Sequence, residues 1–171
     1  VNNVSVGSDI YDKSIKSDVS IKASDISTVQ AGLQFINHRF QVGKFGISTT
    51  FSDLSTGNRI TGNQMSAYVL HDVAPTKKWR INYGLRYSSF VQNGKWYFGA
   101  EPRAAVRFAI DSTQSFKINY TKMYQYLHLV STTGAALPTD IWYPSTAGVK
   151  PQNGQQAGLG YSRSISQNRL F

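Results

Sequence analysis

The sequence predicts an all-β protein, an antiparallel meander of about eight strands that is an excerpt of a larger transmembrane β-barrel. The first observation is composition: only 16% of the 171 residues are charged, against about a quarter in an average globular chain. Ten tyrosines and many valines and threonines favour pleated sheets. The second observation is period-two alternation of apolar and polar side chains, and the third is how short and long connections are distributed.

The clearest predicted strand covers residues 79–91. Its odd positions, from Trp79 to Val91, are mostly apolar, and its even positions include Arg80 and Arg86. Asn93-Gly94 follows, which is a strong signal for a two-residue hairpin. A strand with one apolar face and one basic face is therefore predicted to turn back at residues 92–95.

Two further strands, residues 97–110 and 115–127, alternate in the same way. In the first, Glu101, Arg103 and Arg107 share the polar face, and in the second Lys117 lies on that face. Lys122 breaks the alternation of the second strand. The sequence also predicts weaker strands at residues 2–11, 28–35, 39–51, 64–73 and 155–165. A change of apolar parity at Gly43-Lys44 predicts a bulge.

The predicted connections alternate in length along the chain. Residues 12–27, 52–63 and 126–152 form long connections, and residues 92–95 form a short to medium one that falls in the same alternate set. Short turns fall between the other strands, at residues 36–38, 74–78 and 111–114. Short turns at one end and long loops at the other are typical of outer-membrane barrels. A soluble β-sandwich also has alternating strands, but two sheets with crossing connections would not sort the loops in this way, so the barrel is favoured.

Several classes of function are excluded or disfavoured. The chain has no cysteine, its three histidines lie far apart, and no catalytic or phosphate-binding motif is present. No enzyme activity and no cofactor are therefore predicted. The net charge is +9, but lysines and arginines occur singly, so nucleic acid is not a predicted partner. No signal peptide or apolar helix long enough to span a membrane is visible.

Several motifs occur in an order that resembles TonB-dependent outer-membrane receptors of the Bacteroidota type, over residues 24–164. They are Glu101-Pro102-Arg103, Gln125-Tyr126-Leu127-His128, residues 137–144 (LPTDIWYP) and Lys150-Pro151-Gln152. The resemblance implies that residues 1–171 are the C-terminal part of a plugged barrel of about 22 strands, without the plug domain. Ser166–Arg169 is interpreted as a tight turn and Leu170-Phe171 as the start of another strand.

The resemblance implies active transport of a scarce or large ligand across the outer membrane of a Gram-negative bacterium. Its implied partners are outer-membrane lipid, the plug domain and the rest of the barrel, the TonB complex acting through the plug, and a surface lipoprotein lid. The substrate is left open among iron chelates, glycans, vitamins and peptides. Two alternatives also remain: a small passive or adhesive outer-membrane barrel, and a soluble carbohydrate-binding β-sandwich.

Candidate site residues lie on the polar face and in the last long loop. A hairpin through residues 92–95 places Arg86 opposite Glu101, a favourable cross-strand charge pair. The basic residues of this face either contact the plug or an anionic substrate, or are hydrated lumen charges. They are Arg80, Arg86, Arg103, Arg107 and Lys117. Trp142 and Tyr143 are predicted to lie beyond the membrane, where they contact substrate or a lid, or pack the loop.

Tyrosines near the predicted strand ends have two possible roles, as sugar-stacking platforms or as interfacial girdle residues. The girdle is favoured, because aromatic side chains concentrate at membrane interfaces. The residues concerned are Tyr83, Tyr87, Tyr97, Tyr120, Tyr124 and Tyr126.

Overall fold

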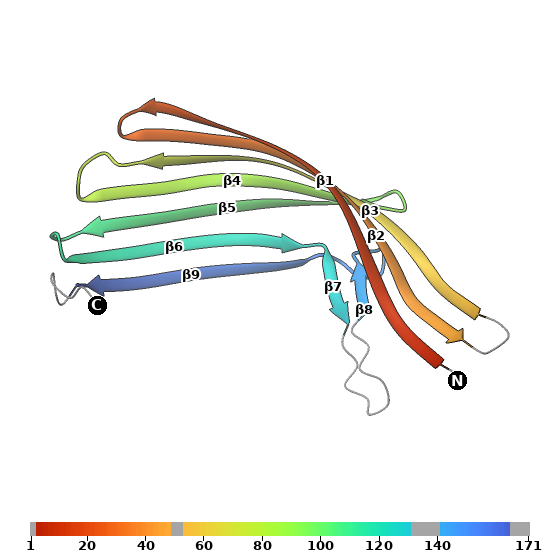
Figure 1. The fold of residues 1–171 in the computed structure, drawn as a ribbon. Coiled ribbons are helices and arrows are strands. Elements are labelled where there is room, and N and C mark those ends of the chain that lie inside the picture. The colour runs from red at the N-terminus through yellow and green to blue at the C-terminus, as the bar shows by residue number, and fades with distance from the viewer. Residues whose placement is uncertain (1–2, 49–52, 131–140, 165–171) are drawn as a thin grey trace.

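A computed structural model describes residues 3–48, 53–130 and 141–164, and these residues form an all-β, antiparallel structure (Figure 1). Seven strands make one sheet in the order β1-β2-β3-β4-β5-β6-β9, and β7 pairs with β8 in a separate two-stranded sheet. The strands are β1 Asn3–Ser24, β2 Ser27–Ser48, β3 Asp53–Val73, β4 Trp79–Gln92, β5 Lys95–Ala109, β6 Gln114–Gln125, β7 Leu127–Val130, β8 Ile141–Pro144 and β9 Gln152–Arg163. The predicted all-β meander is confirmed.

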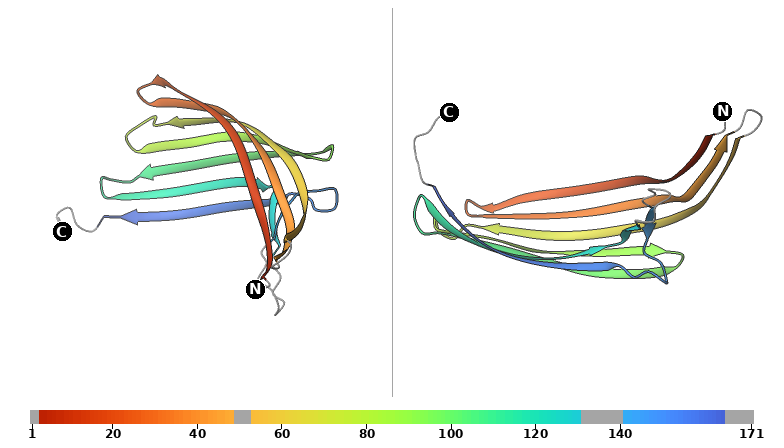
Figure 2. Two further views of the ribbon diagram at one scale, coloured as in Figure 1. Left: turned by 45° about the vertical axis from the view of Figure 1, so that its right-hand side comes forward. Right: turned by 90° about the horizontal axis from the view of Figure 1, so that it is seen from below.

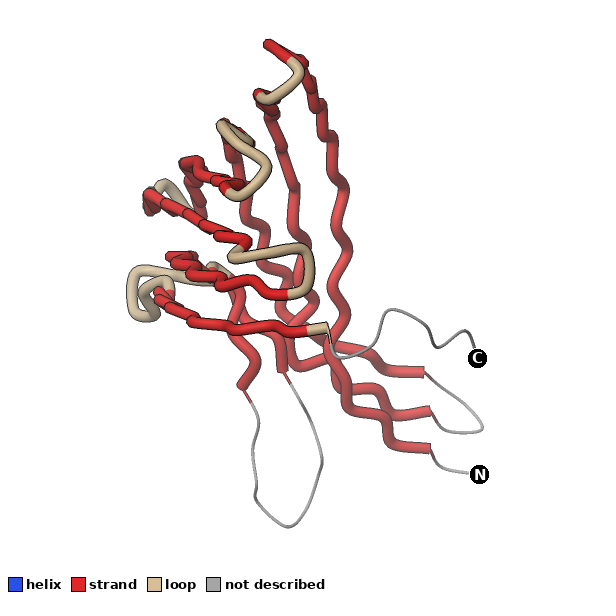
Figure 3. The backbone as a smooth tube through the Cα atoms, turned by 90° about the vertical axis from the view of Figure 1, so that its left-hand side faces the viewer, coloured by secondary structure: helices blue, strands red, loops and turns tan. Residues whose placement is uncertain are grey.

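The large sheet is strongly curved and open. Two views show it bending into a trough, with β1 at one edge and β9 at the other (Figure 2). Seen from the end of the sheet at which β4 begins, the strands follow an arc rather than a closed ring (Figure 3). Among the described residues neither edge strand has a second partner, so each presents a row of unpaired backbone groups to whatever lies beside it.

The first three strands are much longer than the sequence predicted, with 22, 22 and 21 residues. The long connection expected at residues 12–27 is wrong, because β1 continues to Ser24 and turns tightly into β2. The short turn expected at residues 36–38 lies in the middle of β2, and most of the loop expected at 52–63 belongs to β3. Charged and small polar residues in these segments weaken the alternation that would have revealed them as strands.

The central hairpin agrees with its prediction. β4 and β5 are joined by Asn93 and Gly94, whose φ values of 47° and 75° are both positive. Two positive φ values are what a type I′ turn requires, and Asn-Gly adopts them readily. The resulting register pairs Arg86 with Glu101, as expected. The bulge expected at Gly43-Lys44 is also confirmed by a register shift between Val42 and Phe45.

Tight turns gather at one end of the sheet, but the other end is mixed. The β1–β2, β3–β4 and β5–β6 connections lie together at the first end (Figure 1). The opposite end holds both the two-residue Asn93-Gly94 turn and the long β6–β9 connection. That connection is not irregular throughout, because it contains the β7–β8 hairpin. The expectations for residues 131–140 and 165–171 lie outside the described residues.

Asp111 shapes the tight turn between β5 and β6. Its Oδ1 atom accepts hydrogen bonds from the Thr113 hydroxyl at 2.8 Å and from the backbone N–H groups of Thr113 and Gln114 at 2.7 and 2.9 Å. These hydrogen bonds, that of the Thr113 hydroxyl first, lower the pKa of the Asp111 carboxyl. An aspartate bonded to the backbone two and three residues ahead is a common way to fix a short turn.

The sheet has an uncovered apolar face. Leu33, Leu85, Ile118 and Leu159 share this face, and each is at least 48% exposed. The buried apolar side chains of the described residues, Phe40, Phe90 and Tyr126, are few by comparison. Within the described ranges no second sheet covers the apolar face. The described residues contain no helix with the length and hydropathy needed to cross a membrane.

Candidate functional site

The polar face carries the six charged residues that the sequence assigned to the lumen: Arg80, Arg86, Glu101, Arg103, Arg107 and Lys117. Nearest the tight turns, Arg80, Arg107 and Lys117 stand directly opposite one another on β4, β5 and β6. Arg80 Nε donates to Asp72 Oδ1 at 3.1 Å, and Asn82 Nδ2 donates to Asp72 Oδ2 at 3.4 Å. Of the three aligned cations only Arg80 is shown in contact with this carboxylate, so the row carries net positive charge.

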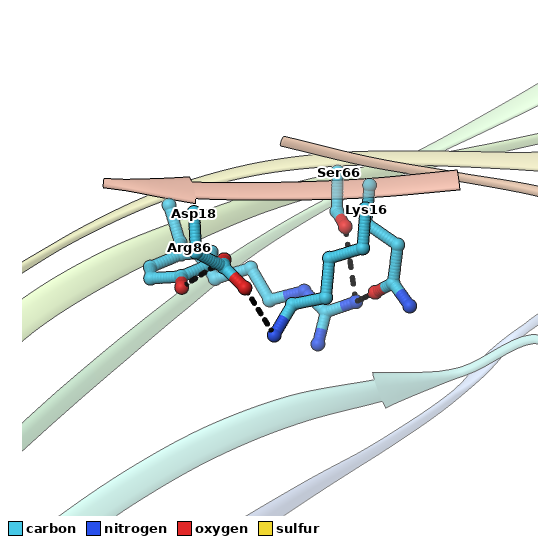
Figure 4. Close-up of polar contacts among 6 residues, drawn as sticks. Lys16, Asp18, Ser66 and Arg86 are labelled. Carbon is cyan, nitrogen blue, oxygen red and sulfur yellow. Dashed lines mark hydrogen bonds and ion pairs between the residues drawn. The ribbon is translucent and has the colours of Figure 1, made fainter. Parts of the chain in front are cut away.

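Arg86 lies further along the same face but does not form the predicted charge pair. Its Nη2 atom donates to Gln34 Oε1 at 3.2 Å and to Ser66 Oγ at 3.0 Å (Figure 4). Although Glu101 is its cross-strand partner, no ion pair joins the two side chains in the described part of the chain. The Nε atoms of Arg86 and Arg103 are buried without a hydrogen-bond partner among these residues. Buried donors of this kind are normally satisfied by water, an ion or a ligand.

A second polar group on β1 lies beside Arg86. Lys16 Nζ forms an ion pair with Asp18 Oδ2 at 2.8 Å, and the Tyr68 hydroxyl donates to Asp18 Oδ1 (Figure 4). The Lys16 and Asp18 side chains are 52% and 43% exposed. A solvent-exposed pair of this kind contributes little to stability. Because both side chains are exposed, the surface beside Arg86 is polar and accessible to solvent.

Glu101 instead belongs to a buried cluster with Ser88 and Phe90 of β4 and with Tyr126, the residue that follows β6. Ser88 Oγ donates to Glu101 Oε1 at 2.5 Å. The Tyr126 hydroxyl lies 2.8 Å from Ser88 Oγ and donates to it, since the serine proton is already used. The Tyr126 ring stacks on Phe90 with a centroid distance of 5.3 Å and an interplanar angle of 12°. Ser88, Phe90, Glu101 and Tyr126 are all at most 5% exposed.

The prediction that Tyr97, Tyr124 and Tyr126 belong to an outer girdle is wrong, because all three lie on the polar-face side of the sheet. Tyr126 contacts polar-face residues, and the Tyr124 ring occupies the space beside Gly99, where an added Cβ would lie 2.5 Å from it. The β5–β6 pairing ends at Arg103 and Thr121, so the last residues of β6 pair only with β9. The ammonium of Lys122, which broke the predicted pattern, lies 5.3 Å from the centroid of the Tyr124 ring.

A buried histidine, His38, continues the buried part of this face, and the sequence analysis did not identify it. His38 is 2% exposed, and its Nδ1 lies 2.7 Å from Asp12 Oδ1. Its ring stacks on Phe40 at 6.0 Å and lies near Phe90 at 6.3 Å. The sequence analysis placed Asp12 in a long connection and His38 in a short turn, so only the long β1–β2 register reveals that the two residues pair.

The β7–β8 hairpin holds Trp142 and Tyr143. Leu129 pairs with Trp142 and His128 with Tyr143, and His128 Nε2 lies 2.9 Å from Ser145 Oγ. Burial lowers the pKa of His128. Behind the hairpin, the Tyr97 hydroxyl donates to the carbonyl of Thr146 at 2.5 Å. The segment is therefore anchored at the end of the sheet, next to β1 and β2 (Figure 1).

Two hollows lie on opposite sides of β8, and each takes one of the predicted loop aromatics. Trp142 lines a hollow of about 530 Å³ that is rich in amide side chains, with Gln64, Tyr124, Tyr126, Gln152 and Asn153 among its lining residues. Tyr143 lines another of about 410 Å³, with Asn58, Thr61, Asn93, Lys95 and Thr146. The two aromatic residues therefore do not converge on a single site.

The described side chains of the polar face and of the two hollows offer hydrogen bonding and aromatic stacking. No group of three or more His, Cys, Asp or Glu is placed to hold a metal ion within the described ranges. The polar face and the Trp142 hollow adjoin through Gln64 and Tyr126, so together they form a continuous candidate binding surface of basic, amide and aromatic groups.

No protein-family model, curated protein or solved structure matches this chain. The resemblance to TonB-dependent receptors thus rests on the sequence motifs alone and stays a prediction.

Proposed function

We propose that this chain is part of the wall of an outer-membrane β-barrel, and that the barrel is a TonB-dependent receptor for active uptake of a scarce or large ligand. One observation carries the first step: an exposed apolar face bounded at both ends by aromatic side chains. The second step adds the ordered sequence motifs and the basic inner face.

The first aromatic row lies at the end with the tight turns. Register places Trp79 opposite Phe108, Phe108 opposite Phe116, and Phe116 opposite Tyr161. Ring centroids are 4.6 Å apart for Trp79 and Phe108 and 5.1 Å apart for Phe116 and Tyr161. Four aromatic rings in one continuous line across four strands match the interfacial girdle of a membrane barrel.

A second aromatic group lies on the same face at the other end. Tyr87 stacks on Phe98 at 6.1 Å, and Phe98 stacks on Trp96 at 6.0 Å. Along β5, ten residues separate Phe98 from Phe108, about 33 Å at about 3.3 Å per residue. With strands tilted by about 40°, the separation along the membrane normal becomes about 25 Å, the height of the apolar band in such barrels.

Several other features support the same proposal. The uncovered face is hard to reconcile with a soluble carbohydrate-binding sandwich, in which a second sheet would cover it. The two unpaired sheet edges suit a wall that continues into neighbouring strands, since lipid requires every backbone group to be paired. On this proposal the tight turns are periplasmic, and the β7–β8 hairpin with Trp142 and Tyr143 is extracellular.

The membrane step can be tested residue by residue, because the chain has no cysteine. A fluorophore on Ile118→Cys should be quenched by a quencher attached to lipid acyl chains and protected from a water-soluble quencher. The matched control is Asn119→Cys, on the opposite face of the same strand, which should show the reverse. A protein that stays soluble without detergent, or equal quenching at both positions, would contradict the membrane placement.

The transport step needs the full-length protein in a Gram-negative cell. Cells are supplied with candidate ligands of the four classes named above: iron chelates, glycans, vitamins and peptides. Uptake of the transported ligand should be lost when the TonB complex is deleted, while membrane insertion of the barrel is unchanged. Uptake that survives the deletion would favour the small passive barrel, and binding to cells without uptake would favour an adhesive one.

A further inference from the structure

A basic cluster lies on the outer face of the first three strands, directly beyond the apolar band. Lys13 on β1, Arg39 on β2 and Arg59 on β3 line one hollow of about 360 Å³, together with Tyr11 and Gln41. All five side chains belong to the alternation that carries the apolar band, and not to the polar face. This outer basic cluster has no part in the candidate binding surface described above.

The change from apolar to basic occurs at the same place on all three strands. Ile15, Phe35 and Met65 are opposite one another in one row and belong to the apolar band. The next outward-facing row consists of Lys13, Asn37 and Asn63. Since a hydrophobic band in a barrel wall ends at the lipid headgroups, the proposed membrane placement puts the cluster at headgroup level on the side of the β7–β8 hairpin.

The three cations are neighbours along a diagonal. Arg39 pairs directly with Tyr11 and with Thr61, so Lys13 and Arg59 are each two residues from a direct partner of Arg39. Diagonal neighbours of this kind are about 7–8 Å apart, and like charges so placed repel each other. Asp9, the nearest acid on this face, stands opposite Gln41.

An apolar hollow lies immediately inside the cluster on the same outer face. It has a volume of about 480 Å³. Its floor has the small residues Ser17, Ala67 and Ser89, and larger apolar side chains surround them. Those larger residues are Ile15, Leu33, Phe35, Met65 and Tyr87. Ile15 of this hollow and Lys13 of the basic cluster are consecutive outward-facing residues of β1, so the two hollows adjoin along the strand.

From this arrangement we propose that the outer basic cluster and the apolar hollow form a single lipid-binding site. Lys13, Arg39 and Arg59 hold the phosphate of an anionic lipid headgroup, and one acyl chain of the same lipid fills the hollow over Ala67. Cations flanking a phosphate form charge-assisted hydrogen bonds with it and relieve their mutual repulsion. The apolar hollow is what selects a lipid over free phosphate. This inference rests on the proposed membrane placement.

The test uses the full-length protein in detergent, with lipid binding followed by native mass spectrometry. The probe is an acylated glucosamine disaccharide with two phosphates, compared with the same lipid after both phosphates are removed. The variant Lys13→Gln/Arg39→Gln/Arg59→Gln should bind the phosphorylated probe about a hundredfold more weakly, since each cation near an anionic surface contributes about fivefold. Binding of the dephosphorylated lipid should change little.

A matched triple variant controls for overall charge. Lys77→Gln/Lys78→Gln/Arg163→Gln removes the same charge at the opposite end of the sheet and should leave binding unchanged. An equal loss in both triple variants would mean unspecific electrostatic attraction and would overturn the proposal. Displacement of the probe by inorganic phosphate at equal concentration would assign the cluster to free phosphate instead.

The acyl-chain half of the site has its own variant. Ala67→Leu fills the hollow and should weaken both forms of the lipid severalfold, whereas Ala104→Leu, on the same apolar face of β5, should not. Equal effects would remove the hollow from the site. If Ile118→Cys shows no contact with lipid, the membrane proposal itself fails. Lipid contact at residue 118 with normal probe binding by the Lys13/Arg39/Arg59 variant would overturn only the present inference.

Discussion

The two faces of the same seven-stranded sheet are organised in opposite ways. On the polar face, side chains are buried by one another: Phe90 is fully buried, and Glu101 is 5% exposed. On the other face Leu159 is 79% exposed and Ile15 is 75% exposed. In water the second arrangement would leave a large apolar surface uncovered. Polar contacts therefore bury side chains on one face of the sheet, whereas the apolar residues of the other face are left exposed, as the proposed membrane placement requires.

The largest expected effect comes from breaking the buried cluster. Phe90→Ala removes the ring that stacks on Tyr126 and lies near His38, and such a truncation costs about 3–5 kcal/mol when the cavity does not collapse. Leu85→Ala, on the apolar face of the same strand, should cost far less, because on the proposed membrane placement lipid can fill the space left by the smaller side chain. Urea unfolding of the full-length protein from lipid vesicles measures both, and equal losses would remove the contrast between the faces.

An added charge should reverse the order of the two faces, so that the larger loss of unfolding free energy comes from the apolar face. Ile118→Arg places a guanidinium on the apolar face in the middle of β6, where such a residue costs about 2–4 kcal/mol at the bilayer midplane. Asn119→Arg adds the same group to the polar face beside Gly158, where water can hydrate it. Unfolding free energies in vesicles should therefore fall strongly for residue 118 and weakly for residue 119. A similar fall at both positions would argue against lipid on one side only.

Sequence reasoning succeeded where alternation was strong and failed where polar residues occupied both faces. Residues 79–91 carry aromatic and aliphatic side chains at nearly every second position, so the strand, its turn and its register could all be predicted. Residues 12–24 alternate Ile15, Ser17 and Val19 with charged partners, and that weak pattern was interpreted as a loop. A strand whose polar face is accessible to water tolerates such residues, but single-sequence patterns cannot distinguish such a strand from a surface loop.

The candidate site was predicted in the same partial way. The predicted face of the sheet was correct for Arg86 and Glu101, because it depends only on the alternation of side chains along each strand and on the position of the turn. Their hydrogen bonds were not predictable, because Gln34, Ser66 and Tyr126 come from strands whose packing no local pattern encodes. Sequence spacing identifies which residues share a face, and three-dimensional packing determines which neighbour each side chain contacts.

A smaller effect distinguishes register from contact on the polar face. A double-mutant cycle with Arg86→Gln and Glu101→Gln should give a coupling free energy at or below about 1 kcal/mol, since opposed charges on neighbouring strands contribute that much at most. The cycle with Ser88→Ala and Glu101→Gln should give a larger value, because the Ser88 hydroxyl donates directly to the carboxylate. A larger coupling for Arg86 would mean that it pairs with Glu101 after all.

The smallest expected effect is a local pH dependence of the β7–β8 hairpin. Burial lowers the pKa of His128 below its usual value of 6.5, so the folded hairpin favours the neutral ring. Above that pH both states are neutral and the hairpin keeps its full stability. As the pH falls below about 6.5 the unfolded segment takes up a proton first, and hairpin stability falls until the folded pKa is reached. Hydrogen exchange of Leu127–Val130 should therefore speed up from pH 7 to pH 5, after correction for the intrinsic rate.

The His128→Gln variant provides the control for that pH dependence. Glutamine can keep a hydrogen bond to Ser145 Oγ, which lies 2.9 Å from the histidine nitrogen, but it does not titrate. Its corrected exchange should be the same at pH 7 and pH 5, while the backbone amides of the β4–β5 hairpin should be unaffected in either protein. Acceleration that persists in His128→Gln would assign the pH response to another group and leave the histidine a purely structural contact.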